Sequence, residues 1–231
     1  MIALGVAAHP DDLDFSSSGT FAKWAKEGAE CYYLICTNGC KGSDDPKMTE
    51  KKLVETRRKE QTSAGKVLGL KDVFFLDHND TELVADLALK KEIVRHIRKL
   101  KPDVVVTLDP TFLYSTERRG GFVNHTDHRA AGLAAMDAVY PMARDRLTFK
   151  ELEEEGLEPH KVKQLYFVSF GNGKEVIDIS GSIDTKIEAL RCHKSQISES
   201  SLEWVKEWAK EAAKGSDYTY AERFVRLNLE R

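Results

Sequence analysis

Short apolar runs alternate with longer segments of helical periodicity along the first part of the chain. The apolar runs have strand length and cover residues 2–8, 31–36, 72–76 and 104–108. Apolar positions recur at helical spacing over residues 16–28, 49–68 and 85–100, and Gly28, Gly69 and Pro102 follow as helix-ending residues. Strands that are apolar throughout suit a parallel sheet covered on both faces. The pattern therefore predicts an α/β fold: a Rossmann-like, mostly parallel sheet with helices on both faces and right-handed crossovers.

The pattern changes after an alanine-rich helix that is expected over residues 127–140. Residues 150–155 are mostly charged and are expected to form a solvated loop or helix face. Residues 162–170 and 175–179 are predicted strands, and Gly171, Asn172 and Gly173 between them are typical of a hairpin turn. Helices are predicted over residues 183–193 and 202–214, whereas residues 220–229 fit a helix or a strand. No repeat or linker interrupts the pattern, so a single domain over residues 1–231 is predicted, with these later elements packed on the same sheet.

Composition indicates a globular protein without a general affinity for polyanions. Of the 231 residues, 41% are apolar and 32% charged, and 35 Lys and Arg against 38 Asp and Glu give a net charge of −3. This balance provides no attraction to nucleic acid or an anionic membrane, and no run approaches the ~20 apolar residues of a membrane span. The N-terminus lacks a basic segment, and the four cysteines (Cys31, Cys36, Cys40 and Cys192) form no CxxC pair. A cytoplasmic protein with reduced thiols is expected.

The first predicted strand ends in a cluster of one histidine and three carboxylates. His9, Asp11, Asp12 and Asp14 follow it directly, at the edge of a parallel sheet where ligands bind. A nucleotide-binding turn would carry glycines here, but the first glycine after the strand is Gly19, and adjacent carboxylates repel phosphate. The charge suits a cation. The alternative is that these aspartates only cap a helix or form a turn.

A second cluster lies between the strand at residues 104–108 and the alanine-rich helix. Residues 124–128 read Asn-His-Thr-Asp-His, and His125 and His128 share a face if the helix begins nearby. A solvated helix start is the alternative. Together the clusters offer imidazole and carboxylate ligands without a thiolate, as in catalytic zinc sites.

The ligand types allow a division of roles but leave one choice open. His9, Asp12 and one of the two later histidines could bind the metal. Asp11 would then be the base that deprotonates water. The remaining histidine, His125 or His128, would act as acid or stabilise an oxyanion. Spacing alone does not decide between these two.

These motifs together resemble those of the LmbE/PIG-L family of zinc-dependent deacetylases, which act on N-acetylglucosamine derivatives. The most specific are AHPDD at residues 8–12 and HxDH at residues 125–128. Weaker matches, in family order, are Thr37, Gly39 and Gly42 of a TxGxxG turn, Arg57 and Glu60 of an R-x-x-E pair, Leu68-Gly69, Asp80, Lys186 with His193, Ser195 and Gln196, and residues 220–224. The resemblance therefore extends from residue 8 to residue 224.

The resemblance implies a ligand set and a base. It makes His9, Asp12 and His128 the zinc ligands, and it makes Asp11 the general base. It implies that His125 stabilises the oxyanion or serves as acid.

The resemblance also implies supporting roles around these residues. Asp127 would orient His125 and favour its protonated form. Arg57 and Asp80 would contact the sugar.

Several positions depart from the family pattern or keep two interpretations. Asp14 stands near the place where relatives often carry Glu, and Val123 where some carry Tyr, so neither is given a role. The polar stretch 111–122 is expected to be a loop over the site, in which Arg118 and Arg119 bind an acidic group or are simply solvated. His193 is expected either near the site or as a helix cap, and Trp204 with Trp208 as packing residues.

The predicted function is hydrolysis of the acetyl group from an acetylated amino-sugar small molecule by zinc-activated water. One alternative is an amidase acting on another small amide, such as a thiol conjugate. Another is a non-catalytic module that binds a sugar or nucleotide, but binding alone would not need Asp11 beside a metal. Another divalent ion could replace zinc, and both the exact substrate and a homo-oligomeric state stay open.

Overall fold

The fold is described from a computed structural model, which covers residues 1–116, 121–169 and 173–230. Part of the expected loop over the site, with Arg118 and Arg119, lies outside the described residues. Gly171 and Asn172 of the expected hairpin turn also lie outside them.

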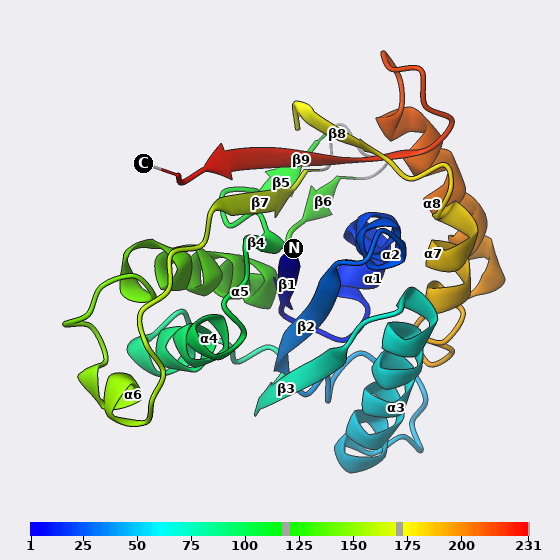
Figure 1. Cartoon of the computed structure of the whole chain (residues 1–231). Coiled ribbons are helices and arrows are strands. Elements are labelled where there is room, and N and C mark those ends of the chain that lie inside the picture. Colours follow the sequence, from blue (N-terminus) through cyan, green and yellow to red (C-terminus); the bar gives the residue numbers. More distant parts are fainter. Residues whose placement is uncertain (117–120, 170–172, 231) are drawn as a thin grey trace.

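A seven-stranded sheet forms the centre of the molecule (Figure 1). Its order is β3 (Asp72–His78), β2 (Glu30–Thr37), β1 (Ile2–Ala7), β4 (Val104–Leu108), β7 (Gln164–Val168), β9 (Ala221–Asn228) and β8 (Glu175–Asp178). The first five strands pair in parallel, and β9 runs antiparallel to both of its neighbours. All five residues of β4 are buried, as expected for a strand covered on both faces. The predicted mostly parallel α/β sheet is confirmed.

Helices cover both faces of this sheet. Figure 1 shows one group on the right, and these helices are α1 (Asp12–Ser16), α2 (Ser18–Lys26), α3 (Glu50–Leu68), α7 (Ile183–Leu190) and α8 (Glu199–Ala212). The group on the left comprises α4 (Leu87–Leu100), α5 (Thr126–Asp137), the π-helical turn η1 (Ala138–Met142) and α6 (Lys150–Glu154). The C-terminal helices thus pack on the same sheet as the N-terminal ones.

Local sequence explains where several helices begin and end. Thr49 caps α3 by accepting a hydrogen bond from the Lys52 N–H at 3.2 Å, and Gly69 ends it in the left-handed conformation. Asp86 caps α4 in the same way. The helix predicted over residues 16–28 is α2, and a separate short helix, α1, precedes it, with Ser17 between the two. Because α1 begins at Asp12, the acidic cluster lies in its first turn.

The expected hairpin between β7 and β8 is wrong. The two strands do not pair, because β9 lies between them and pairs with both. Val168 of β7 and Glu175 of β8 both lie opposite Phe224, so the chain leaves one side of β9 and continues along the other. Gly173 lies at this crossing, where a Cβ would be only 2.7 Å from the Phe224 backbone. The segment that fitted either a helix or a strand is β9.

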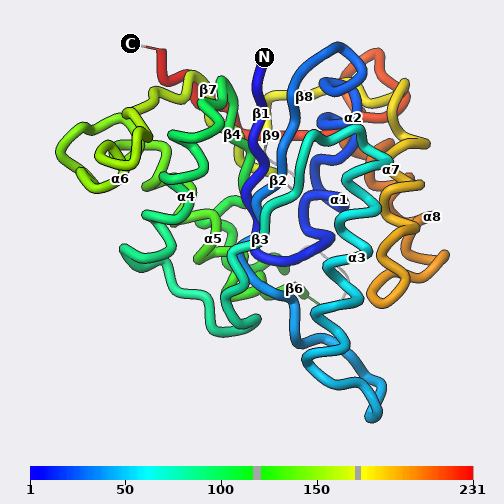
Figure 2. Tube along the Cα trace, turned by 60° about the horizontal axis from the view of Figure 1, so that its bottom comes forward, coloured from blue at the N-terminus to red at the C-terminus, as the bar shows by residue number. Residues whose placement is uncertain are grey.

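The loops after the parallel strands gather on one side of the molecule. In Figure 2 both chain ends lie at the top, whereas the loops that follow β1, β2 and β3 lie below, near β6. Strands β5 (Tyr114–Ser115) and β6 (Phe122–Val123) form a small antiparallel pair there. Among the described helices, none has the length and apolar character needed to cross a membrane.

Candidate metal centre and active site

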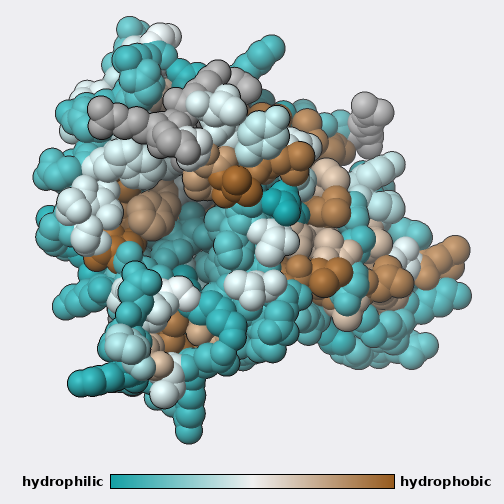
Figure 3. Space-filling model, turned by 180° about the vertical axis from the view of Figure 1, so that it is seen from behind, coloured by the Kyte–Doolittle hydropathy of each residue, from teal (hydrophilic) through white to brown (hydrophobic). Residues whose placement is uncertain are grey.

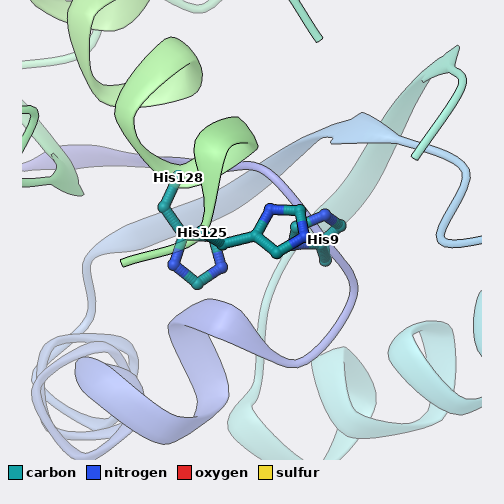
Figure 4. A group of neighbouring side chains, drawn as sticks. All are labelled: His9, His125 and His128. Atoms are coloured by element: carbon teal, nitrogen blue, oxygen red, sulfur yellow. The ribbon is translucent and has the colours of Figure 1, made fainter. Parts of the chain in front are cut away.

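The two predicted clusters meet beyond the ends of β1 and β4. His9 lies in the turn after β1, and His125 and His128 lie at the start of α5. Their ring centroids are 4.7 to 5.4 Å apart. Figure 4 shows the His128 ring pointing down from the start of α5 and the His125 ring extending sideways, with its edge near His9. Seen from behind, the molecule has a hydrophilic hollow bordered by apolar surface on this side (Figure 3).

The His9 ring is held by carboxylates on both of its nitrogens. Its Nε2 lies 3.0 Å from Asp80 Oδ1 and 3.2 Å from Asp127 Oδ2. Its Nδ1 faces Asp12 Oδ2 at 3.5 Å. Burial lowers the pKa of His9, but Asp12, Asp127 and Asp80 outweigh it and raise that pKa to about 12. A proton on Nε2 would be donated to Asp80 and Asp127 and would leave Nδ1 as a metal donor beside Asp12.

The His128 ring is fixed by an amide instead. Its Nδ1 lies 3.0 Å from Asn124 Oδ1, and its Nε2 lies 3.0 Å from Asp12 Oδ1. The Asn124 Nδ2 donates to the Phe112 carbonyl at 2.7 Å, so the amide oxygen is the atom that faces His128. A carbonyl oxygen only accepts, which places a proton on Nδ1, so Nε2 would be the nitrogen that offers its lone pair to a metal.

These residues fit a divalent cation of the zinc type. One Asp12 oxygen faces His9 Nδ1 and the other faces His128 Nε2, and the other nitrogen of each imidazole has a partner, as metal-binding histidines require. Ring nitrogens of His9, His125 and His128 also lie within 4.8 Å of one another. The same holds for ligand atoms of His9, Asp80, His125 and Asp127. We choose among these ligand sets by the hydrogen bonds of the imidazole nitrogens that do not face Asp12.

Asp11 occupies a strained position beside this cluster. Its φ of 90° lies in the left-handed region, which costs a residue other than glycine about 1–2 kcal/mol. Arg57 Nη2 lies 3.3 Å from Asp11 Oδ2 and donates to the Pro10 carbonyl at 2.9 Å. Burial raises the pKa of Asp11 to about 6, although Arg57 opposes the rise and Asp12 adds to it.

Asp127 contacts both His9 and His125, through different groups. Its carboxylate accepts hydrogen bonds from the Thr81 N–H at 2.7 Å and the Leu83 N–H at 3.3 Å, and these hold it against His9. Its backbone N–H donates to His125 Nδ1 at 3.2 Å. Burial, followed by the charge of His9, lowers the pKa of His125, whereas the charge of Asp127 raises it. The roles of Asp127 and His125 stay predictions.

Arg57 and Asp80 are buried between the loops around the site. Arg57 Nη1 donates to the carbonyls of Gly39 and Lys41 at 3.2 and 3.4 Å. Asp80 accepts from the Lys41 N–H at 3.3 Å, and hydrogen bonding by His9 holds its pKa below the usual value although burial raises it. These contacts organise the loops after β2 and β3, and contact with a sugar stays a prediction.

Three residues that the sequence left without a firm role lie directly behind Asp11. Gln61, Asp14 and His193 are each fully buried and joined by hydrogen bonds. Gln61 follows Glu60 and lies one turn after Arg57 on α3, so helical spacing could have indicated it. Asn124, beside the HxDH motif, was likewise not assigned.

Two other motif fragments meet away from the metal cluster. Lys186 Nζ donates to Glu222 Oε1 at 2.6 Å and to the Phe15 carbonyl at 2.7 Å, and Glu222 accepts from the N–H groups at the start of α2. Both side chains are buried, so this ion pair joins α1, α2, α7 and β9. Trp204 and Trp208 stack at 4.7 Å, with Trp204 half exposed.

Comparison with known proteins shows which family the chain resembles. The family profile described as PIG-L, GlcNAc-PI de-N-acetylase, matches residues 4–139. Diacetylchitobiose deacetylase of Thermococcus kodakarensis is 32% identical over 228 residues, covering 96% of this chain and 82% of the relative. A 1D-myo-inositol 2-acetamido-2-deoxy-alpha-D-glucopyranoside deacetylase of Kineococcus radiotolerans is 27% identical, covering 84% of this chain and 68% of that protein.

A solved structure is similar over nearly the whole chain. N,N'-diacetylchitobiose deacetylase from Pyrococcus horikoshii, in complex with its inhibitor MPG, has a TM-score of 0.88 and 26% identity. The superposition covers 98% of this chain and 84% of the solved chain. With a family profile that spans more than half of the sequence and relatives aligned along its length, this chain belongs to the PIG-L (LmbE) family.

Proposed function

We propose that this protein is a zinc-dependent hydrolase that removes the acetyl group from an N-acetylglucosamine-containing small molecule. The observation that carries the proposal is the position of the Asp12 carboxylate between His9 Nδ1 and His128 Nε2. Zinc held by these three residues would supply a Lewis acid that polarises an amide carbonyl and lowers the pKa of water at the site. The metal dependence agrees with the family, and zinc is our choice because the donors are two imidazoles and one carboxylate.

Asp11 accepts a proton from the attacking water in this proposal. A carboxyl with a pKa raised to about 6 is largely ionised at neutral pH yet more basic than a solvated one. Arg57 holds one of its oxygens, Oδ2, and the other is proposed to accept the proton. The proton then passes to the nitrogen as the C–N bond breaks, which gives acetate and a free amino sugar.

His125 stabilises the negative charge that develops on the amide oxygen. Because its Nδ1 accepts the Asp127 N–H, the neutral ring carries its proton on Nε2 and can donate from there. The lowered pKa of His125 favours this neutral donor over an imidazolium acid. Val123 supplies no hydroxyl, so His125 takes this role without a tyrosine.

An acetylated amino sugar is the substrate class that the relatives support. Diacetylchitobiose and the inositol-linked acetamido sugar, named in those relatives, share the N-acetylglucosamine unit. Arg57 and Asp80 are proposed to position this unit. The protein is further proposed to work as one domain in the cytoplasm, and its oligomeric state is an open prediction.

Replacement of Asp11 by Asn tests the assignment of the base. We expect normal zinc content with turnover reduced by about 10²–10⁴-fold, the usual contribution of a general base. Acetate release from N,N'-diacetylchitobiose, N-acetylglucosamine and a thiol-conjugate amide would be measured in parallel to separate deacetylase from general amidase activity. Asp178→Asn makes the same chemical change on β8 and serves as control. Wild-type turnover by Asp11→Asn would refute the assigned base.

A further inference from the structure

The backbone of Asp11 is held from behind by a buried chain of polar side chains. Its N–H donates to Gln61 Oε1 at 2.8 Å, and Gln61 Nε2 donates to Asp14 Oδ2 at 2.7 Å. His193 Nε2 lies 3.0 Å from the same Asp14 oxygen. Gln61, Asp14 and His193 are each 0% exposed. Three fully buried polar side chains therefore connect the loop after α7 to the residue proposed as the base.

The hydrogen bonds fix which way the Gln61 amide points. Asp14 Oδ2 accepts from the nitrogen of the Gln61 amide, which turns the amide oxygen toward the Asp11 N–H. The Asp11 N–H needs that oxygen, because the residue has a left-handed φ of 90° and no side-chain cap at the start of α1. Without an acceptor at this point, nothing on α3 would secure the Asp11 N–H.

The loop that carries His193 is itself docked on the helix that carries Gln61. The N–H and the Oγ of Ser195 donate to the two Glu60 oxygens at 2.8 and 2.7 Å. Glu60 precedes Gln61 directly, so α3 binds the loop with one residue and the active-site turn with the next. His193 Nδ1 and Asp14 Oδ1 have no partner among the described residues, which leaves the chain oriented only through Asp14 Oδ2.

We propose that Gln61 is a positioning residue for the catalytic base, with Asp14 and His193 fixing its amide. This inference rests on the proposed function, because it assigns Asp11 as the base. Gln61 reaches the backbone of Asp11 and not its carboxylate, so it acts on where the base is held. Asp14, which had no role from sequence, acquires one as the acceptor that orients Gln61.

Gln61→Met tests the proposal by removing both hydrogen bonds at similar length. We expect zinc content and KM to stay near wild type while kcat falls about 10–100-fold, the range for a displaced catalytic group. Ser182→Ala is the matched control, since Ser182 also loses a buried side-chain hydrogen bond, to the Gly19 carbonyl at 2.7 Å. A kcat for Gln61→Met equal to that of Ser182→Ala would overturn the proposal.

An exchange of groups provides a rescue test and a second variant should Gln61→Met fold poorly. Gln61→Glu alone sets two carboxylates against each other and should lose kcat. Adding Asp14→Asn restores one amide and one carboxylate, now with the carboxylate at position 61 and the amide at position 14. If His193 changes its tautomer to accept from this amide, the double variant should recover most of the lost kcat. Failure of the double variant to exceed the single one would contradict a role for amide orientation.

Amide exchange separates this proposal from the assignment of the base. In ¹⁵N-labelled protein the Asp11 N–H should be protected, and protection should be lost in Gln61→Met but kept in Ser182→Ala. If Asp11→Asn stays active, the base assignment fails while this measurement still reports whether Gln61 holds Asp11. If Asp11→Asn is inactive and Gln61→Met has wild-type kcat, the positioning role alone is refuted.

Discussion

Asn124→Ala should weaken zinc binding without removing a metal ligand. Asn124 accepts from the Nδ1–H of His128 at 3.0 Å and so leaves Nε2, which faces Asp12, as the nitrogen that would offer its lone pair to a metal. Without that acceptor, the ring can rotate or move its proton to Nε2. Metal binding must then restore the orientation and the tautomer, at a cost in affinity.

The expected loss is at the lower end of the range for such outer contacts. These contacts contribute about 10–100-fold in metal affinity. A hydrogen bond between neutral groups contributes about 0.5–1.5 kcal/mol net, and every 1.4 kcal/mol is tenfold. The His128 side chain is 25% exposed, so water can partly replace the lost acceptor. We therefore expect a roughly tenfold rise in the zinc Kd.

Asn124→Asp separates the metal contact from the loop contact. Aspartate still accepts from His128 but cannot donate to the Phe112 carbonyl, which receives the Asn124 Nδ2 at 2.7 Å. Competition with a chromogenic chelator would give the Kd of each variant, with Asn228→Ala on β9 as the control. Zinc affinity should survive in Asn124→Asp and fall in Asn124→Ala. Equal losses in both, or no loss in either, would refute the tautomer argument.

Three further changes probe other parts of the structure. His128→Ala should lower zinc content while His125→Ala leaves it largely intact, and metal analysis giving the reverse order would exchange their roles. Gly173→Ala places a Cβ 2.7 Å from the β9 backbone, so urea denaturation should show a loss of about 1–3 kcal/mol in the free energy of unfolding; an unchanged midpoint would mean that the crossing can relax. Lys186→Met leaves Glu222 buried and unpaired and should cost about 3–5 kcal/mol, and adding Glu222→Gln should recover part of it; a single variant as stable as wild type would show that water reaches the pair.

The fold followed from sequence where local pattern and tertiary environment agree. Apolar strands and capped helices such as α3, between Thr49 and Gly69, are specified within about 20 residues. The hairpin expected around Gly173 failed because the turn signal is local, whereas the pairing of β9 with β7 and β8 joins segments about 50 residues apart. A Gly-Asn-Gly sequence is compatible with a tight turn and equally with a close crossing over another backbone.

The site was predictable as a set of residues but not as a set of contacts. Sequence motifs indicated that His9 and His128 would meet, because each follows a strand that ends at the same edge of the sheet. The partners of Asp127 could not be predicted, since they are backbone N–H groups at Thr81 and Leu83 in a loop whose path depends on packing. Gln61 carried a helical spacing signal but no chemistry that distinguishes it from a surface glutamine.

The site carries more negative than positive side chains around His9, and this excess favours a bound cation. Three carboxylates, those of Asp12, Asp80 and Asp127, converge on His9, and Arg57 pairs with Asp80 and with the neighbouring Asp11. Carboxylates this close require further positive charge, which a divalent cation supplies. Protonation of His9 can supply only part of it, and the raised pKa of His9 is the response of the imidazole to this field. A metal held by His9 Nδ1 and Asp12 would balance the charge of Asp12, while Asp80 and Asp127 stay hydrogen-bonded to His9 Nε2. The order β3-β2-β1-β4 produces this division, because it brings one outer carboxylate from each side of β1.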